Sequence, residues 1–256
     1  MKAARTRSLS RSGHVAAPSP FALDLIEALG ESAVQWRAER LRAYEYDGSI
    51  DVGHPAAVAL VATDADAASA IRVASRHGQP VVARGSGTGL SGGAVATRGG
   101  LTLSFSRMRA INLIDPPNLR AVVEPGVINL DVSRAVASHG LYFAPDPSSQ
   151  AACSIGGNIA ENAGGAHCLA YGVTTNHVTG LECILADGTT LGTGTLSSGN
   201  SGADVPGYDL TGAIVGSEGT FAVVTKASLR LMPVAEAVRT MLASFPTVDD
   251  ASRATS

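Results

Sequence analysis

A nine-residue loop offers the most specific chemistry in this sequence. Residues 84–92 read Arg-Gly-Ser-Gly-Thr-Gly-Leu-Ser-Gly and follow directly on the apolar run 80–83, which is typical of a strand. Each glycine costs about 0.5–1 kcal/mol of backbone entropy relative to alanine. The four glycines in this loop therefore predict a segment whose main-chain N–H groups close around an oxyanion or a cofactor.

Two other motifs overlap this loop, and the sequence that follows argues against both. Residues 87–92 match the dinucleotide fingerprint, which requires a helix directly after it and an acidic residue about 20 positions later. A turn and the alternating strand 101–105 follow instead, and the region near residue 109 is basic. Residues 89–93 match the nucleophile elbow of hydrolases, with Ser91 as the nucleophile, but that motif also needs a helix. A flexible linker is disfavoured because the loop lies between two apolar strands.

A second glycine-rich segment, residues 154–165, is predicted to form a short helix with glycines at both ends. The exposed amides of its first turn could accept a phosphate. The alternative is that Gly156 and Gly157 only allow close packing of the backbone.

Helices and strands with clear end signals must position these segments. Ser19 and Pro20 begin a helix that Gly30 ends, so we expect the folded part to start near residue 19. Further helices are predicted over 64–77 and 129–139, each followed by glycine and then by a strand. His77 and His139 fall in last helical turns, where the helix dipole favours a cation, and this explains them better than catalysis.

The second half of the sequence has the pattern of an antiparallel sheet. Residues 178–185 alternate, turn at Asp187-Gly188 and return through 189–191, which predicts a hairpin. A polar surface loop is expected over 192–207, and a long strand over 221–231.

Composition restricts the class of partner. The net charge of -3 from 19 basic and 22 acidic residues gives no electrostatic footprint for nucleic acid or an anionic membrane. No run of 18 apolar residues occurs, so no membrane span is expected. The 29 glycines are clustered, which suggests several loops converging on one small-molecule ligand.

The three cysteines, Cys153, Cys168 and Cys183, lack a CxxC spacing. This argues against zinc and disulfides, and favours small buried thiols in a reducing, cytoplasmic compartment. The basic, serine-rich N-terminus mimics an organelle transit peptide, but a disordered basic tail over 1–18 is the preferred interpretation.

Four blocks of this sequence, in order and at matching spacing, resemble one family. They are residues 84–93; 124–127 with 145–149; 155–165 with 171–174; and 206–210 with 216–220. The chain is similar to the FAD-linked oxidases with a flavin domain of the vanillyl-alcohol-oxidase/p-cresol-methylhydroxylase type. Within them it is most similar to the group of glycolate oxidases and D-lactate dehydrogenases. The resemblance covers residues 20 to 256.

This resemblance implies an α+β fold of two subdomains with FAD between them, over residues 19–233. Residues 234–256 would then begin a substrate or cap domain whose remainder is missing. The glycine loop would wrap the pyrophosphate, and the later blocks would line the ribityl, ring and adenosine parts. The cofactor-binding residues implied are Arg84, Gly85, Ser86, Gly87, Thr88, Gly89, Leu90, Ser91, Pro145, Asp146, Ser148, Ser149, Ser154, Ile155, Gly156, Gly157, Asn158, Asn162, Gly164, Gly165, Gly172, Val173, Tyr208, Glu218, Gly219 and Val224.

The implied reaction is hydride transfer from the hydroxyl-bearing carbon of a 2-hydroxy acid to the flavin. Relatives with covalent flavin carry histidine in the glycine loop where this chain has Thr88, so non-covalent FAD is expected. The family's leucine-glycine-valine is replaced by Phe221-Ala222-Val223, which makes close backbone approach there less certain. No catalytic residue and no metal ligand is assigned, so the chain alone is expected to be inactive. Partners would be the hydroxy acid and an electron acceptor or companion oxidase subunits.

Two rivals stay open. One is a non-catalytic flavin-binding fragment or assembly subunit, and the weaker one is a serine hydrolase that uses Ser91. A flavin spectrum excludes the hydrolase, and bleaching of that spectrum by substrate excludes the fragment.

Overall fold

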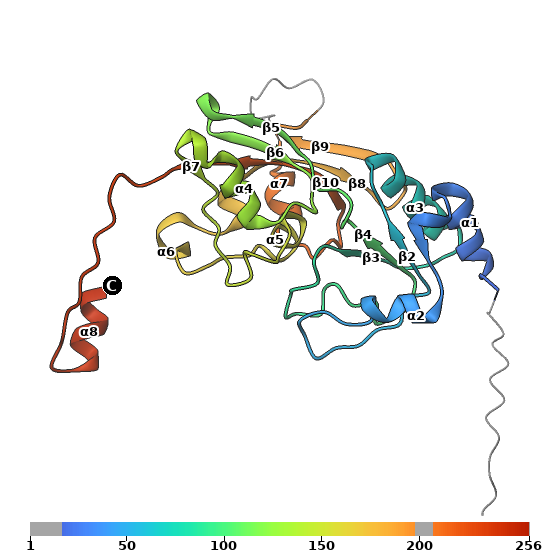
Figure 1. Cartoon of the computed structure of the whole chain (residues 1–256), viewed down its shortest axis with the longest axis horizontal. Helices are drawn as coiled ribbons and strands as arrows, with labels where there is room; N and C mark the ends of the chain where they lie inside the picture. The colour runs from blue at the N-terminus through green and yellow to red at the C-terminus, as the bar shows by residue number, and fades with distance from the viewer. Residues whose placement is uncertain (1–16, 198–206, 256) are drawn as a thin grey trace, which may run out of the picture.

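The computed structural model describes residues 17–197 and 207–255, whose two larger sheets have separate cores (Figure 1). The first sheet has the order β1-β2-β4-β3. Its strands are β1 (Val34–Gln35), β2 (Ala57–Leu60), β4 (Leu101–Ser104) and β3 (Val81–Arg84). β4 pairs in parallel with both β2 and β3. The ends of β3 and β4 therefore meet at one edge, where the glycine loop begins.

Helices α1 (Pro20–Leu29) and α3 (Asp64–Arg76) cover the first sheet. Both begin as their sequences predict, because the Ser19 side chain accepts from the Ala22 amide and Thr63 forms a capping box with Asp66. His77, expected in the last turn of this helix, is the residue directly after its end at Arg76. Its Nε2 lies 2.7 Å from Asp24 Oδ2 of α1, so it also ties the two helices together.

The second sheet is antiparallel throughout, in the order β5-β6-β10-β8-β9. Its strands are β5 (Ile111–Asp115), β6 (Arg120–Val123), β10 (Val223–Arg230), β8 (Val178–Ile184) and β9 (Thr190–Gly194). The predicted hairpin is confirmed as β8 and β9. Helices α4 (Asn129–Val136), α5 (Ile155–Glu161) and α7 (Leu210–Ile214) contribute to the core of this half.

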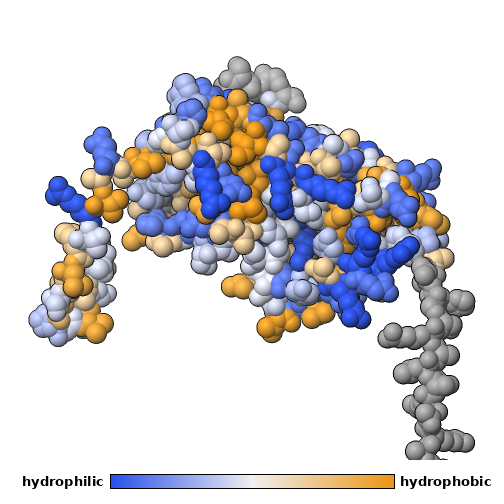
Figure 2. Space-filling model, in the orientation of Figure 1, coloured by the Kyte–Doolittle hydropathy of each residue, from blue (hydrophilic) through white to orange (hydrophobic). Residues whose placement is uncertain are grey.

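Several shorter elements complete the described chain. They are α2 (Ala38–Leu41), α6 (Cys168–Tyr171) and the paired strands β7 (Leu141–Tyr142) and β11 (Met232–Pro233). After β11 an extended segment leads to α8 (Val248–Thr255), which lies away from both sheets (Figure 1). Apolar side chains are exposed along this segment (Figure 2), including Met241 and Leu242.

The two halves meet at β8 and β10. Ile184 of β8 and Val223 of β10 belong to the core of the first sheet. Lys226 Nζ of β10 lies 2.6 Å from Asp64 Oδ2 of α3 and 2.7 Å from Glu182 Oε1 of β8. Burial lowers the pKa of Lys226, but hydrogen bonds and charge from the two carboxylates outweigh burial and raise it overall. The Lys226 ammonium group therefore stays charged and forms an ion pair with each half of the fold.

Some sequence expectations need correction. Cys153 and Cys183 are buried, and burial raises the pKa of Cys183 to about 12, but Cys168 is exposed because it begins the short surface helix α6. The helix predicted over 129–139 is α-helical only to Val136 and ends in a tighter 3-10 turn. The strand expected over 221–231 is shorter at both ends. Residues 1–16 of the predicted tail and 198–206 of the predicted loop lie outside the described residues.

Candidate functional site

The glycine loop forms one wall of a cavity of about 160 Å³ that residues of both sheets line. Three stretches meet there: the loop after β3, residues 153–163 around α5, and residues 214–224 between α7 and β10. The site therefore lies where the two halves of the fold come together.

The loop presents unused hydrogen-bond donors. In the part of the chain that the structure describes, the backbone N–H groups of five consecutive residues, 85–89, have no protein acceptor. Backbone N–H groups that are not satisfied by the protein are available to an anion. This segment therefore has the chemistry that its glycines predict.

Two glycines allow this conformation. A Cβ atom at Gly85 would overlap Ser154 Oγ, so the loop can approach α5 only without a side chain. Gly87 has a φ of +69°, and a Cβ atom there would overlap the Arg84 guanidinium. Both a left-handed backbone and a close approach are therefore needed at this turn.

Arg84, at the end of β3, contacts the glycine loop through its buried side chain. It is 7% exposed, and its Nη1 donates to the Ala94 carbonyl at 3.2 Å, while the guanidinium lies 5.7 Å from the ring centroid of Tyr44. Burial lowers the pKa of Arg84, and this effect is larger than the opposing effect of the Asp47 charge, which raises it. An arginine remains charged under such opposing effects, so the loop keeps a positive charge beside the cavity.

Asp47 lines the same cavity and interacts with Arg84 through its negative charge. Burial raises the pKa of Asp47, but hydrogen bonds from Ser49 and Ala94 and the charge of Arg84 lower it overall. Its Oδ1 accepts from the Ser49 amide at 2.7 Å, while the buried Oδ2 has no partner. The carboxylate thus stabilises the arginine, and one of its oxygens has no hydrogen-bond partner in the described chain.

Two buried polar groups of the lining also lack partners. Asn158 Nδ2 and Ser217 Oγ are inaccessible to solvent and make no hydrogen bond. A buried donor without an acceptor is unfavourable, and in native proteins it calls for an explanation such as a missing ligand. Together with the free amides, these donors fit a cofactor rich in acceptor oxygens and nitrogens, as FAD is.

The first turn of α5 differs from the loop. The amides of Ile155, Gly156 and Asn158 donate to chain carbonyls at 2.8–2.9 Å, and Ser154 Oγ accepts from the Gly157 amide at 3.4 Å. The expectation of exposed amides here is therefore wrong, because the N-cap serine and the 125–127 backbone satisfy them. A Cβ atom at Gly156 would lie 2.7 Å from Pro125 Cβ, which agrees with the close-packing alternative.

Ser91 does not have the surroundings of a hydrolase nucleophile. Its hydroxyl donates to Glu161 Oε2 at 2.9 Å, and residues 91–94 form bends and a turn in place of the required helix. The hydroxyl therefore joins the loop to the end of α5.

The structure brings fourteen of the implied binding residues to the cavity lining and leaves twelve outside it. Those in the lining are Arg84, Gly85, Ser86, Gly87, Thr88, Gly89, Ser149, Ser154, Gly156, Gly157, Asn158, Glu218, Gly219 and Val224. Those outside are Leu90, Ser91, Pro145, Asp146, Ser148, Ile155, Asn162, Gly164, Gly165, Gly172, Val173 and Tyr208. For both groups, the assignment as cofactor-binding residues stays a prediction.

The residues outside the lining have other surroundings. Ile155 is in the core, Tyr208 is 96% exposed, and Asn162 Oδ1 accepts from the Thr175 amide at 2.9 Å. Asp146 Oδ2 lies 2.6 Å from His167 Nδ1 on the surface. Ile155, Asn162 and Asp146 therefore already have partners within the chain.

Sequence reasoning missed several residues of the lining, among them Asp47, Pro125, Glu161 and Ser217. Asp47 begins an Asp-Gly-Ser turn, and this turn signal could have marked a second loop near the site. Pro125 and Glu161 lie in or beside segments that were singled out, but their side chains gave no separate signal.

Comparison with known proteins gives consistent matches. The family described as "FAD binding domain" matches residues 55–194. "Glycolate oxidase subunit GlcD" of Bacillus subtilis is 46% identical over 214 residues, covering 83% of this chain and 45% of that protein. "D-lactate dehydrogenase" of Archaeoglobus fulgidus is 40% identical over 214 residues, covering 82% of this chain and 47% of that protein. The chain thus spans less than half the length of these relatives.

The fold also matches a solved structure. Alkyldihydroxyacetonephosphate synthase aligns with a TM-score of 0.73 at 17% identity, covering 85% of this chain and 41% of that one. At this identity the match speaks for the fold alone. Within the described residues, none of the helices has the length and apolarity needed to cross a membrane.

Proposed function

Because the chain belongs to the FAD-binding domain family, we propose that it is the FAD-binding part of a flavin-dependent oxidoreductase that acts on the CH–OH group of 2-hydroxy acids. Its cofactor is FAD, and the resemblance to the vanillyl-alcohol-oxidase/p-cresol-methylhydroxylase type of flavin domain is confirmed. The names of the relatives, glycolate oxidase and D-lactate dehydrogenase, support the substrate class.

One observation carries the assignment of the cofactor to this cavity. The five free amides of residues 85–89 lie beside a buried arginine in the wall between the two halves. Such donors would bind the diphosphate of FAD, since consecutive N–H groups and a nearby positive charge favour an oxyanion. Asn158 and Ser217 would donate to acceptors elsewhere on the cofactor.

The residues of this chain bind and orient, and the cofactor carries the redox chemistry. The bound FAD would supply the acceptor for the hydride that leaves the hydroxyl-bearing carbon of the substrate. The loop fixes the cofactor between the two sheets, and the apolar lining, which includes Phe105 and Ile159, limits water at that wall. Thr88 offers no imidazole nitrogen, so we propose that FAD is held without a covalent bond.

Two tests separate cofactor binding from catalysis. Acid precipitation of the FAD-loaded chain should release the yellow colour into the supernatant, and flavin in the washed pellet would contradict non-covalent binding. Mixed anaerobically with glycolate or D-lactate, the FAD-loaded chain alone should stay yellow, because no group of its described residues is assigned to hold the substrate carboxylate. Dithionite should still bleach the bound flavin, which would show that this flavin can be reduced.

A chimera tests the activity directly. These residues would replace the matching part of the Bacillus subtilis relative, which is 46% identical. Glycolate should bleach the flavin of the chimera in stopped flow. A chimera that retains FAD but is not bleached would contradict the oxidoreductase and favour the rival of a non-catalytic flavin-binding fragment. Bleaching of the short chain alone would place the substrate site within it, and His167, paired with Asp146, would be the first base to test.

Two further assignments belong to this proposal. The relative of Bacillus subtilis is named as a subunit, which supports companion subunits or an electron acceptor as partners. The free cysteines, Cys153, Cys168 and Cys183, support a reducing, cytoplasmic compartment.

A further inference from the structure

A second hollow lies at the far end of the antiparallel sheet and shares no lining residue with the cofactor cavity. It has a volume of about 710 Å³ and is lined by residues of β6, β8, β10 and β11 and by the turn before β6. This size falls within the range of small-molecule sites, roughly 300–1,000 Å³. We call it the arginine groove, after Arg120 and Arg230 in its lining.

The two arginines are directly opposite each other. Arg120 of β6 pairs in register with Arg230 of β10. Like charges at directly opposed positions of an antiparallel pair destabilise the sheet. Unless a negative charge compensates them, this pair is therefore unfavourable.

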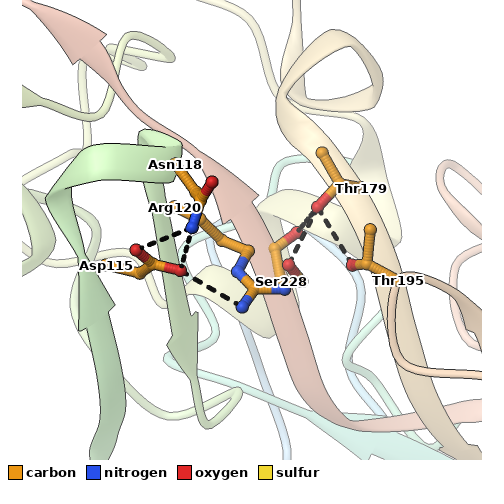
Figure 3. Close-up of polar contacts among 6 residues, drawn as sticks. All are labelled: Asp115, Asn118, Arg120, Thr179, Thr195 and Ser228. Atoms are coloured by element: carbon orange, nitrogen blue, oxygen red, sulfur yellow. Dashed lines mark hydrogen bonds and ion pairs between the residues drawn. The ribbon is translucent and has the colours of Figure 1, made fainter. Parts of the chain in front are cut away.

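The chain compensates only one of them. Asp115 Oδ2 lies 3.3 Å from Arg120 Nη2, and Asn118 Nδ2 donates to both oxygens of that carboxylate at 3.0 and 2.9 Å (Figure 3). Arg230 is exposed, and no carboxylate of the described residues pairs with it. The groove therefore keeps one uncompensated positive charge.

Arg120 also has a donor without a partner. Its Nε is buried and makes no hydrogen bond, although the same guanidinium reaches Asp115. In Figure 3 the Arg120 side chain lies over β10, between Asp115 on one side and Ser228 and Thr179 on the other. Burial of a guanidinium donor without an acceptor is unfavourable, so Asp115 satisfies the Arg120 guanidinium only in part.

Hydroxyl groups continue the polar side of the groove. Thr179 Oγ1 lies 2.8 Å from Ser228 Oγ and 3.3 Å from Thr195 Oγ1, and both threonines line the groove. Hydroxyl groups can turn to donate to an incoming oxygen. Leu119, Met232 and Pro233 form apolar walls beside them.

We propose that the arginine groove binds a small organic oxyanion, in which a carboxylate or phosphate lies between Arg230 and Arg120 and an apolar body lies against Leu119, Met232 and Pro233. The site is independent of the cofactor cavity. Its occupation would offset the repulsion between the two arginines.

The test measures binding to the FAD-loaded chain by calorimetry, with hexanoate, hexyl phosphate and the neutral hexanol as probes. Hexanoate or hexyl phosphate should bind saturably, and the tighter of the two identifies the head group. Hexanol should bind far more weakly, and inorganic phosphate should displace the bound probe. Arg230→Gln should weaken binding about tenfold or more, as expected for loss of a charge-assisted hydrogen bond.

The matched control is Arg76→Gln, which removes the same charge from an exposed position on α3. It should leave the affinity unchanged, and retained FAD would show that each variant is folded. Three results would overturn the proposal: no saturable binding of either anionic probe, binding of hexanol as tight as that of hexanoate, or equal affinities for wild type and Arg230→Gln. None of them would affect the FAD assignment, because that site is lined by different residues.

Discussion

The glycine loop and the first turn of α5 are alike in sequence but differ in what their amides do. Both are glycine-rich, both line the same cavity, and both could be interpreted as anion sites from sequence alone. In the loop, residues 85–89 leave five amides without an acceptor in the described chain. In α5, the amides of residues 155–158 are all bonded within the protein.

This difference shows that glycine content does not identify a binding site by itself. The deciding feature is whether a neighbouring backbone or side chain already accepts from each amide. Ser154 and the 125–127 backbone accept from α5, whereas the loop lies beyond the end of β3, where no strand continues. We therefore expect substitutions in the two regions to have different effects.

The largest effect is expected for Gly87→Val. The substitution forces a β-branched residue into a φ of +69° and against Arg84. Strain of this kind costs about 1–3 kcal/mol, so FAD affinity should fall about 10- to 100-fold. FAD titration monitored by flavin fluorescence would measure the change.

Gly140→Val is the matched control outside the cavity lining. It puts the same β-branched residue at a φ of +67°, in the turn before β7. FAD affinity should stay close to wild type. Equal FAD retention by Gly87→Val and Gly140→Val would show that the loop is not the diphosphate site.

A smaller effect with two opposite signs is expected for Ser217→Ala. The substitution removes a buried hydroxyl that lacks a partner in the described chain and leaves a side chain of nearly the same size, so the FAD-free chain should be unchanged or slightly more stable. FAD binding should weaken about 3- to 10-fold, since a net hydrogen bond contributes about 0.5–1.5 kcal/mol. Thermal unfolding with and without FAD measures both signs.

A loss of stability without FAD would contradict this prediction, because it would mean that the Ser217 hydroxyl already has a partner in the unliganded chain. Thr193→Ala provides a control on the same sheet, since Thr193 Oγ1 makes hydrogen bonds to Thr211 Oγ1 and from the Leu181 amide. That variant should be less stable in both states.

The loop, the helix ends and the hairpin could be predicted because their signals are local. A capping serine at Ser19, a turn at Asp187-Gly188 and a glycine at Gly78 each restrict the backbone within a few residues. The family resemblance added the arrangement in two halves, which no local signal contains.

The remaining site could not be predicted because it depends on which distant residues meet. Asp47 reaches Arg84 only after the chain between β1 and β2 folds over the loop, and Pro125 reaches Gly156 through a long-range backbone contact. No local sequence signal distinguishes Cys168 from the two buried cysteines. Cys168 is exposed because it lies on the surface helix α6. Satisfaction of the α5 amides likewise depends on residues about thirty positions earlier.

A moderate effect on stability is expected for Ser154→Ala. The substitution removes the hydroxyl that accepts from Gly157 at the start of α5. Loss of an N-cap costs about 0.5–2 kcal/mol, and the free energy of unfolding measured in urea should fall by that amount. Ser75→Ala, at an exposed position of α3, should not lower the stability. An unchanged stability of Ser154→Ala would mean that α5 does not depend on this cap.

The smallest effect is expected at the Lys226 ion pairs, which connect the two halves of the fold. Lys226→Met removes the ammonium that lies between Asp64 of the first half and Glu182 of the second. The groups are about 30% exposed, so the loss should be about 1 kcal/mol or less. Because the folded state raises the pKa of Lys226, its contribution is fully present below the unfolded pKa and is lost as the pH rises through the higher folded value. The difference in melting temperature between wild type and Lys226→Met should therefore be constant near neutral pH and shrink in strongly alkaline buffer. A difference that persists there would show that methionine acts through packing at this junction, and that the ion pairs do not hold the two cavity walls together.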